Sequence, residues 1–198
     1  MIYDFAKTAP MDRYKLLAGC VVPRPIALVS TTDGKGGHNA APYSFFNVMS
    51  HEPALLVLGV DQRRADIPKD TVANIRITND FVVNLVDVGI AEAMNVCAID
   101  FDAGVDELRE AGLTPAPSTQ VQAPRIAEAP VAMECRLMDE LRYRNGRSIV
   151  VDDAVADMDV ARALLRDAAL PPYLAPARRV VVAHEEPRRR RQVEDAAH

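Results

Sequence analysis

A segment of mixed aromatic and polar side chains, residues 39–50, lies between two apolar runs and is the first candidate for chemistry. Within five positions it holds three of the ten Phe and Tyr residues of the chain beside polar residues, namely Tyr43, Ser44, Phe45, Phe46 and Asn47. This mixture suits a wall against a flat, partly polar ligand, because rings cover a face while amides and hydroxyls meet heteroatoms. A half-buried strand with Phe45 inward and Ser44 outward explains the same residues, and composition alone favours this simpler interpretation.

A second candidate is a group of cationic and hydroxyl-bearing residues just before a short apolar stretch, and it comprises Arg63, Arg64, Lys69, Asp70, Thr71 and Asn74. A lysine directly before the start of a helix can bind a phosphate, since the free N–H groups and the helix dipole favour an anion. The alternative is an ordinary helix cap, in which Asp70 or Thr71 serves the helix and Lys69 extends into water.

The sequence lacks the short motifs of several other enzyme classes. It has no G-x-S-x-G, no G-x-x-x-x-G-K-[ST] and no G-x-G-x-x-G, which argues against a serine hydrolase, a phosphate-binding loop and a dinucleotide fold. The four histidines show no metal-ligand spacing, so we expect no metal. The three cysteines are odd in number and far apart, which favours reduced thiols and a cytoplasmic location.

The composition bounds the remaining function classes. The 198 residues are 49% hydrophobic and 26% charged with a net charge of -5, which suits one domain with a buried core. A protein that binds duplex nucleic acid normally has a basic surplus, so we expect no nucleic-acid partner. The chain contains no apolar run of about 18 residues, the length that a membrane helix needs. We therefore expect no membrane partner and a small-molecule substrate.

Apolar runs predict the strands that must position these candidates. Residues 26–31, 54–60 and 81–86 read as buried strands. Residues 133–143 and 148–155 flank an Asn-Gly pair at 145–146, which predicts a long hairpin with a type I′ turn. Because strands and helices do not alternate regularly, an antiparallel sheet is expected rather than a doubly wound one.

Helices are expected in four places between or after these strands, at residues 72–78, 90–98, 105–111 and 157–168. The third should stop at Gly112, a residue suited to the position after a helix. Residues 114–130 hold four prolines and no clear period, so they are expected to cross the fold as an irregular segment.

Taken together, the segments resemble the flavin reductase-like, FMN-binding split-barrel family. The matching pieces occur in the family's order at residues 22–31, 39–47, 69–71 with 74–75, 81–84, 105–107 with 111–113, and 129–135. The resemblance spans residues 14–151.

The resemblance implies a mainly β (α+β) fold, a six-stranded antiparallel split β-barrel with inserted helices. It also implies a homodimer with FMN near the subunit interface. The residues that the resemblance places at the cofactor are Arg24, Thr31, Thr32, Tyr43, Ser44, Phe45, Phe46, Asn47, Arg64, Lys69, Asp70 and Thr71. Among them, Lys69, Asp70 and Thr71 would lie at the phosphate or ribityl end, with Arg64 as a helper.

The implied activity is that of an FMN-dependent oxidoreductase, which passes hydride from NADH or NADPH to the flavin, or electrons from the flavin to an acceptor. The flavin performs this chemistry, and no catalytic residue of the protein is identified. The alternative is an FMN-binding electron carrier or flavin store without turnover of the pyridine nucleotide. The basis for it is the C-terminus, where residues 176–184 lack the Gly pair and Tyr of the family pattern and residues 188–191 are all Arg. We therefore divide the chain into a flavin-binding domain, 1–170, and a divergent C-terminal segment, 171–198.

Overall fold

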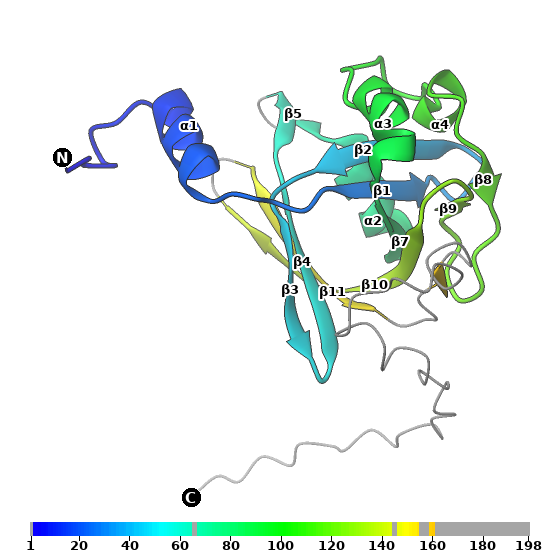
Figure 1. Ribbon diagram of the computed structural model, residues 1–198. Helices are drawn as coiled ribbons and strands as arrows, with labels where there is room; N and C mark the ends of the chain where they lie inside the picture. Colours follow the sequence, from blue (N-terminus) through cyan, green and yellow to red (C-terminus); the bar gives the residue numbers. More distant parts are fainter. Residues whose placement is uncertain (1, 65–66, 144–145, 155–158, 161–198) are drawn as a thin grey trace, which may run out of the picture.

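The computed structural model describes residues 2–64, 67–143, 146–154 and 159–160, and its centre is one antiparallel sheet (Figure 1). The strands follow the order β2–β1–β7–β10–β11–β4–β3, and β12 pairs with the start of β10. The strands of this sheet are β1 (Ala27–Thr32), β2 (His38–Tyr43), β3 (Phe46–His51), β4 (Ala54–Val60), β7 (Asp80–Leu85), β10 (Val131–Arg142), β11 (Ser148–Ala154) and β12 (Asp159–Val160).

The two edge strands of this path, β2 and β3, are consecutive in the chain. Only Ser44 and Phe45 separate them, although they stand at opposite ends of the strand order. A connection this short requires the sheet to curl until its end strands meet without forming a hydrogen-bonded ladder. The result is a barrel with an open seam, and the seam lies at the segment predicted as a ligand wall.

The expected mainly β split barrel is confirmed, but the expected number of six strands is wrong. Seven strands follow the main path and β12 is an eighth. One reason is that residues 39–50 do not form the single strand of the simpler interpretation. They turn at Ser44 and Phe45 and enter two strands instead. Phe45 is also exposed rather than inward, and Phe46 is the ring that enters the core.

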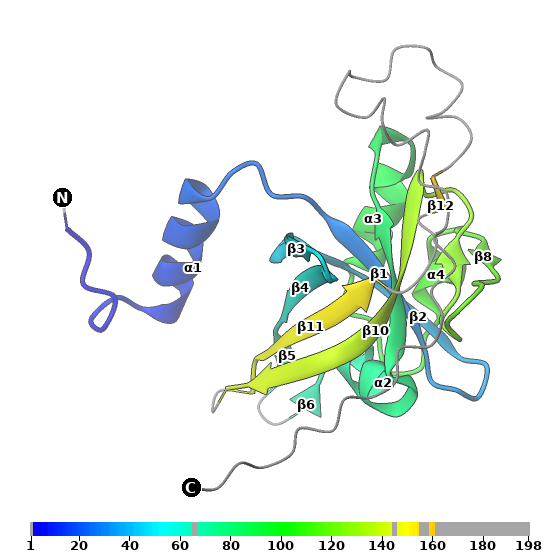
Figure 2. The same ribbon diagram turned by 90° about the horizontal axis from the view of Figure 1, so that it is seen from below.

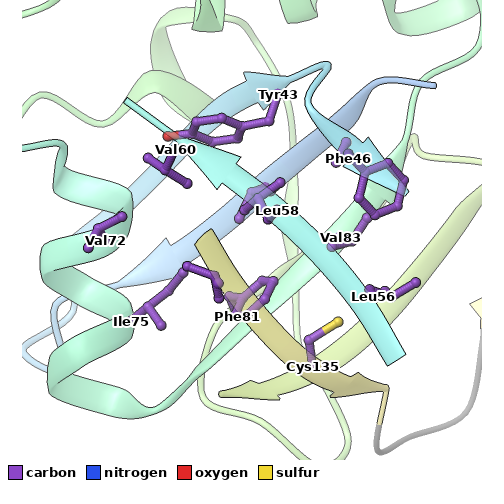
Figure 3. Packing of buried hydrophobic residues seen from close by; sticks show 13 residues of the cluster. Tyr43, Phe46, Leu56, Leu58, Val60, Val72, Ile75, Phe81, Val83 and Cys135 are labelled. Atoms are coloured by element: carbon purple, nitrogen blue, oxygen red, sulfur yellow. The ribbon is translucent and has the colours of Figure 1, made fainter. Parts of the chain in front are cut away.

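The interior of the curled sheet is filled by a hydrophobic cluster that includes Leu58, Ile75 and Phe81 (Figure 3). Helix α2 (Asp70–Thr78) closes one side of it with Val72 and Ile75. The opposite face of β1 is covered by a second cluster, to which α3 (Ala91–Cys97) and α4 (Glu107–Glu110) contribute. Because both of its faces are covered, β1 is buried along its whole length, as its continuous apolar pattern predicted.

The proline-rich crossing segment is held by buried polar side chains rather than by long strands. It contains only the short strands β8 (Pro115–Ala116) and β9 (Arg125–Ile126). The Asp80 carboxylate accepts hydrogen bonds from the backbone N–H groups of residues 122 and 123, at 3.0 and 3.2 Å. Asn84 accepts one from the N–H of Ile126 at 2.9 Å and donates to Leu28 on β1. These bonds satisfy backbone groups that an irregular segment leaves unpaired.

Helix α1 (Pro10–Cys20) was not predicted from the sequence, although a proline in its first turn followed by Asp12 is a helix-start signal. The helix stands apart from the sheet in both views (Figures 1 and 2), and none of its residues is buried. Its main connections to the body are a ring contact between Tyr14 and Phe45 and hydrogen bonds from Arg24.

Most other predicted elements agree with the structure. The hairpin of β10 and β11 is confirmed, with Gly146 at a φ of 75°, while Asn145 lies outside the described residues. The helix expected at residues 90–98 is present as the short turn η1 (Val88–Ile90) followed by α3, and Gly112 follows α4 with a φ of 68°.

The helix predicted at residues 157–168 is wrong at 159–160. These two residues form β12, because they complete the ladder of β10. The remainder of that prediction, and the whole segment 171–198, lies outside the described residues.

Candidate functional site

The seam between β2 and β3 carries the predicted ring wall. Ser44 and Phe45 form the connection, and Phe46 and Asn47 begin β3. The backbone O of Phe45 accepts a hydrogen bond from the N–H of Gly59 on β4 at 2.7 Å. A Cβ on Gly59 would lie 3.1 Å from the Cβ of Phe45, a tight contact that favours glycine at this position. The backbone of Phe45 is therefore fixed against β4, while its ring stays exposed.

Arg24 connects this wall to α1. Its Nε donates to the Ser44 hydroxyl at 3.3 Å, and its guanidinium also donates to the backbone O atoms of Ala18 and Val21 at the end of the helix. A cavity of about 270 Å³ opens here, and its lining includes Arg24, Ser44, Phe45, Phe46 and Asn47. The structure thus brings together five of the residues predicted to contact the cofactor.

A second cavity, of about 360 Å³, collects the predicted phosphate-end residues, and its lining includes Asn39, Arg63, Lys69, Asp70, Thr71 and Glu107. Ala41 and Pro42 of β2 line it too. Since β2 leads directly into Ser44, one stretch of chain runs from this cavity to the seam cavity. The arrangement suits an elongated ligand with a flat end and a polar end.

Lys69 occupies the N-cap of α2, and no side chain caps the helix there. The prediction that Asp70 or Thr71 serves as the cap is therefore wrong. These two residues form the first turn instead. The Asp70 carboxylate accepts a hydrogen bond from Arg63, and the Thr71 hydroxyl is bonded to two other side chains. This hydroxyl accepts hydrogen bonds from Tyr43 at 2.9 Å and from Asn39 at 3.1 Å. The backbone N–H groups of the first turn of α2 therefore have no side-chain cap, and the residue directly before this turn is Lys69.

Tyr43 is buried, and its hydroxyl contacts Thr71, which lines the second cavity. Burial raises the pKa of its hydroxyl, and the nearby Glu107 and Asp70 charges act in the same direction. The hydroxyl therefore stays protonated and can donate to Thr71 at any ordinary pH. This places Tyr43 behind the cavity wall, as a residue that fixes Thr71.

Thr31 and Thr32 are buried in β1 and line neither of the two cavities. The Thr31 hydroxyl accepts a hydrogen bond from Asn74 at 3.0 Å, which ties β1 to α2. The Thr32 hydroxyl donates to the backbone O of Gly37 at 2.9 Å and closes the β1–β2 turn. Within the structure, both residues support the elements that carry the site.

Arg63 lines the second cavity. It donates to Asp70 at 3.4 Å, to Asp100 at 3.3 Å and to the backbone O of Phe101. Arg64 lies in the short strand β5 (Gln62–Arg64), which pairs with β6 (Ile67–Pro68). The side chain of Arg64 is outside the described part of the chain.

Sequence reasoning did not single out Glu107 as a site residue. Its side chain lines the second cavity although the residue is only 8% exposed, and it accepts a hydrogen bond from the backbone N–H of Ala40 at 3.1 Å. Burial raises its pKa, and the nearby charges of Asp70 and Asp106 add to the effect. The only sequence signal for Glu107 was its position in a segment that resembles the family. Its contact with β2 could not be foreseen, because Ala40 lies 67 residues away in the chain.

A family model described as "Flavin reductase like domain" matches residues 18–171. The chain belongs to this family. An uncharacterized relative from Deinococcus radiodurans is 44% identical over 152 residues, which cover 75% of this chain and 67% of the relative.

Two solved structures extend the comparison with flavin reductase-like proteins. The 2-nitrobenzoate 2-nitroreductase of Pseudomonas fluorescens has a TM-score of 0.75 and 40% identity, covering 83% of this chain and 78% of its own. Nitrilotriacetate monooxygenase component B from Bacillus cereus has a TM-score of 0.78 and 31% identity, covering 83% of both chains. The family supports involvement of a flavin in this flavin reductase-like protein.

Within the described residues, no three His, Cys, Asp or Glu side chains form a group that could hold a metal ion. No helix in the same part of the chain is long and apolar enough to cross a membrane.

Proposed function

We propose that this flavin reductase-like protein binds FMN and acts as an oxidoreductase that takes hydride from NADH or NADPH. The observation that carries the proposal is the pair of cavities joined by β2, one lined by Ser44, Phe45 and Asn47, the other by Lys69 at the uncapped start of α2. A flat ring with a phosphate-terminated chain matches this division into a largely apolar cavity and a polar cavity that carries Lys69.

The residues present fit such a group at both ends. Lys69 and the first-turn N–H groups of α2 would hold the phosphate, because both favour an anion. Thr71, fixed by Tyr43 and Asn39, would offer its hydroxyl at a defined position. Ser44, oriented by Arg24, would meet a polar edge of the ring, while Phe45 would cover part of its face. A bound flavin supplies the redox chemistry, and the protein orients it and excludes water.

We also propose that the protein is a homodimer with the flavin near the subunit interface. Support comes from uncovered apolar side chains on and beside the seam, since Phe45, Val48 and Met49 are all exposed at the edge strand β3. Helix α1 likewise exposes Met11 and Leu17. Large apolar side chains left exposed, where they gather into a patch, are typical of an interaction site. Sedimentation equilibrium on the full chain tests this part of the proposal.

The binding part of the proposal is tested by absorbance and fluorescence titration of the purified protein with FMN. Saturable quenching of flavin fluorescence is expected. A colourless protein that shows no FMN binding would refute the proposed function.

The turnover part is tested by anaerobic mixing of the FMN-loaded protein with NADH and, separately, with NADPH. Rapid bleaching of the flavin by either nucleotide is the expected result. Binding without bleaching would favour the alternative, an FMN-binding electron carrier or flavin store. The basis of this alternative, the divergent C-terminal segment, lies outside the described residues.

Among acceptors, 2-nitrobenzoate is a reasonable first choice, since the name of the Pseudomonas fluorescens relative contains it. A cytoplasmic location stays a prediction from the cysteine content.

A further inference from the structure

A buried carboxylate lies in the cavity that also carries the proposed phosphate end. Glu107 belongs to α4, which packs beside β2 on the outer face of the barrel, and its residue is only 8% exposed. The cavity lining includes Glu107 together with Asn39, Lys69 and Thr71. A carboxylate is rarely kept in such a place without a partner, because burial of a charge costs several kcal/mol.

The known partners of this carboxylate do not account for its charge. It accepts a hydrogen bond from the backbone N–H of Ala40 at 3.1 Å. No cation forms an ion pair with Glu107 among the residues that the structure describes, and the nearby charges of Asp70 and Asp106, both acidic, raise its pKa further. An ionised carboxylate offers about four acceptor sites, so this backbone donor leaves room for donors from a ligand.

The chemistry of the cavity indicates which part of a ligand Glu107 would meet. A phosphate would be repelled by the carboxylate and attracted to Lys69 and the α2 terminus. A hydroxyl group is a neutral donor, and its hydrogen bond to a carboxylate is stronger than one between neutral groups. The segment of FMN between ring and phosphate is a chain of such hydroxyl groups.

We propose that Glu107 is a ligand-binding residue that accepts a hydrogen bond from a hydroxyl of the ribityl chain. This inference rests on the proposed function, because it concerns the same two cavities. It assigns Glu107 to recognition of the polyol, Lys69 to recognition of the phosphate and the seam to recognition of the ring.

Three flavins separate these roles, since lumiflavin has the ring alone, riboflavin adds the polyol and FMN adds the phosphate. In the Glu107→Gln variant the dissociation constant of riboflavin should rise about tenfold, the loss expected for a charge-assisted bond. FMN should weaken by a smaller factor, because removal of the carboxylate also removes its repulsion of the phosphate. Lumiflavin should bind as it does to the wild type. Glu110→Gln, an exposed position on the same helix, is the matched control and should change none of the three constants.

An unchanged riboflavin constant in a folded Glu107→Gln variant would overturn the inference, and so would equal weakening of riboflavin and lumiflavin. If the Glu107→Gln variant does not fold, the inference can be tested on the wild type with two flavins that differ in the hydroxyl groups of the side chain. The wild type should bind riboflavin about tenfold more tightly than an N10-pentyl flavin that lacks the hydroxyls. Equal affinity for these two compounds would reject the role of Glu107. A wild type that binds none of the flavins would reject the proposed function itself, whereas flavin binding without any Glu107 effect would reject only the inference.

Discussion

The ion pair between Arg76 on α2 and Glu140 on β10 should make a measurable contribution to the free energy of unfolding, and its size can be estimated from the structure. The carboxylate of Glu140 accepts hydrogen bonds from Arg76 on α2 at 2.6 and 3.1 Å, from Ser148 at 2.6 Å and from Arg142 at 2.9 Å. Arg76 belongs to the helix whose first turn forms the proposed phosphate end. The interaction therefore holds the helix of the site against the sheet.

The magnitude follows from the pKa of Glu140. Hydrogen bonding from Arg76 is the main cause that lowers this pKa from 4.5 to about 2, with further hydrogen bonds from Ser148 and Arg142, and partial burial opposes the shift. A change of this size corresponds to about 3 kcal/mol in favour of the folded state at neutral pH. Because the two guanidinium groups are partly exposed and screened by solvent, we expect Glu140→Gln to lower the free energy of unfolding by about 2 kcal/mol at pH 7.

The dependence on pH has a definite sign. The pKa is lower in the folded state, so the stabilisation is fully present above the unfolded value, near 4.5, and is lost as the pH falls toward 2. The difference in unfolding free energy between wild type and Glu140→Gln should therefore shrink from pH 5 to pH 3. The exposed Glu110→Gln variant should show no comparable difference at any of these values.

Urea unfolding followed by circular dichroism at pH 7, 5, 4 and 3 measures these quantities directly. A difference below about 0.5 kcal/mol at pH 7 would show that the pair is no stronger than an ordinary surface salt bridge. A difference that stays constant down to pH 3 would show that the charge of Glu140 is not its source. Either result would refute the reasoning from the pKa.

Three further predictions concern the site. Lys69→Ala should weaken FMN about tenfold or more in a titration and leave riboflavin nearly unchanged, because a charge-assisted contact is worth about 1.5–3 kcal/mol; equal loss for both ligands would place Lys69 away from the phosphate. Arg24→Lys should weaken lumiflavin several-fold, since an ammonium cannot reproduce the forked contacts to Ser44 and the end of α1; unchanged lumiflavin affinity would contradict that role. Gly59→Ala should lower the melting temperature by a few degrees, because its Cβ would lie 3.1 Å from Phe45; a thermal-shift measurement without any decrease would show that the strands adjust freely.

Local sequence patterns were sufficient for many elements of the fold. The run at residues 54–60 coincides with β4, and Gly112 follows α4 with the positive φ that its position suggested. These predictions succeeded because a buried strand and a helix end depend mainly on neighbouring residues. Helix α1 was missed for the complementary reason. It buries none of its residues, and so the apolar periodicity that marks a packed helix is weak.

The site was predicted in composition but not in arrangement. The resemblance named Lys69 and Ser44, and the structure places both at cavities. It could not show that Thr31 is buried behind the site, nor that Arg63 lines the cavity beside Lys69. These facts depend on which face of a strand a side chain takes and on which loop packs against it.

By itself the sequence determined an acidic chain with antiparallel strands, an anion-suited residue before a short helix, and the family to which these segments belong. Only the tertiary structure decided that Ser44 and Phe45 lie at an open seam, and that the carboxylate of Glu107 reaches Ala40, 67 residues away in the chain. The physical reason is that strand propensity and capping act over a few residues. A cavity, in contrast, is formed by packing between elements far apart in the chain, and no local pattern records it.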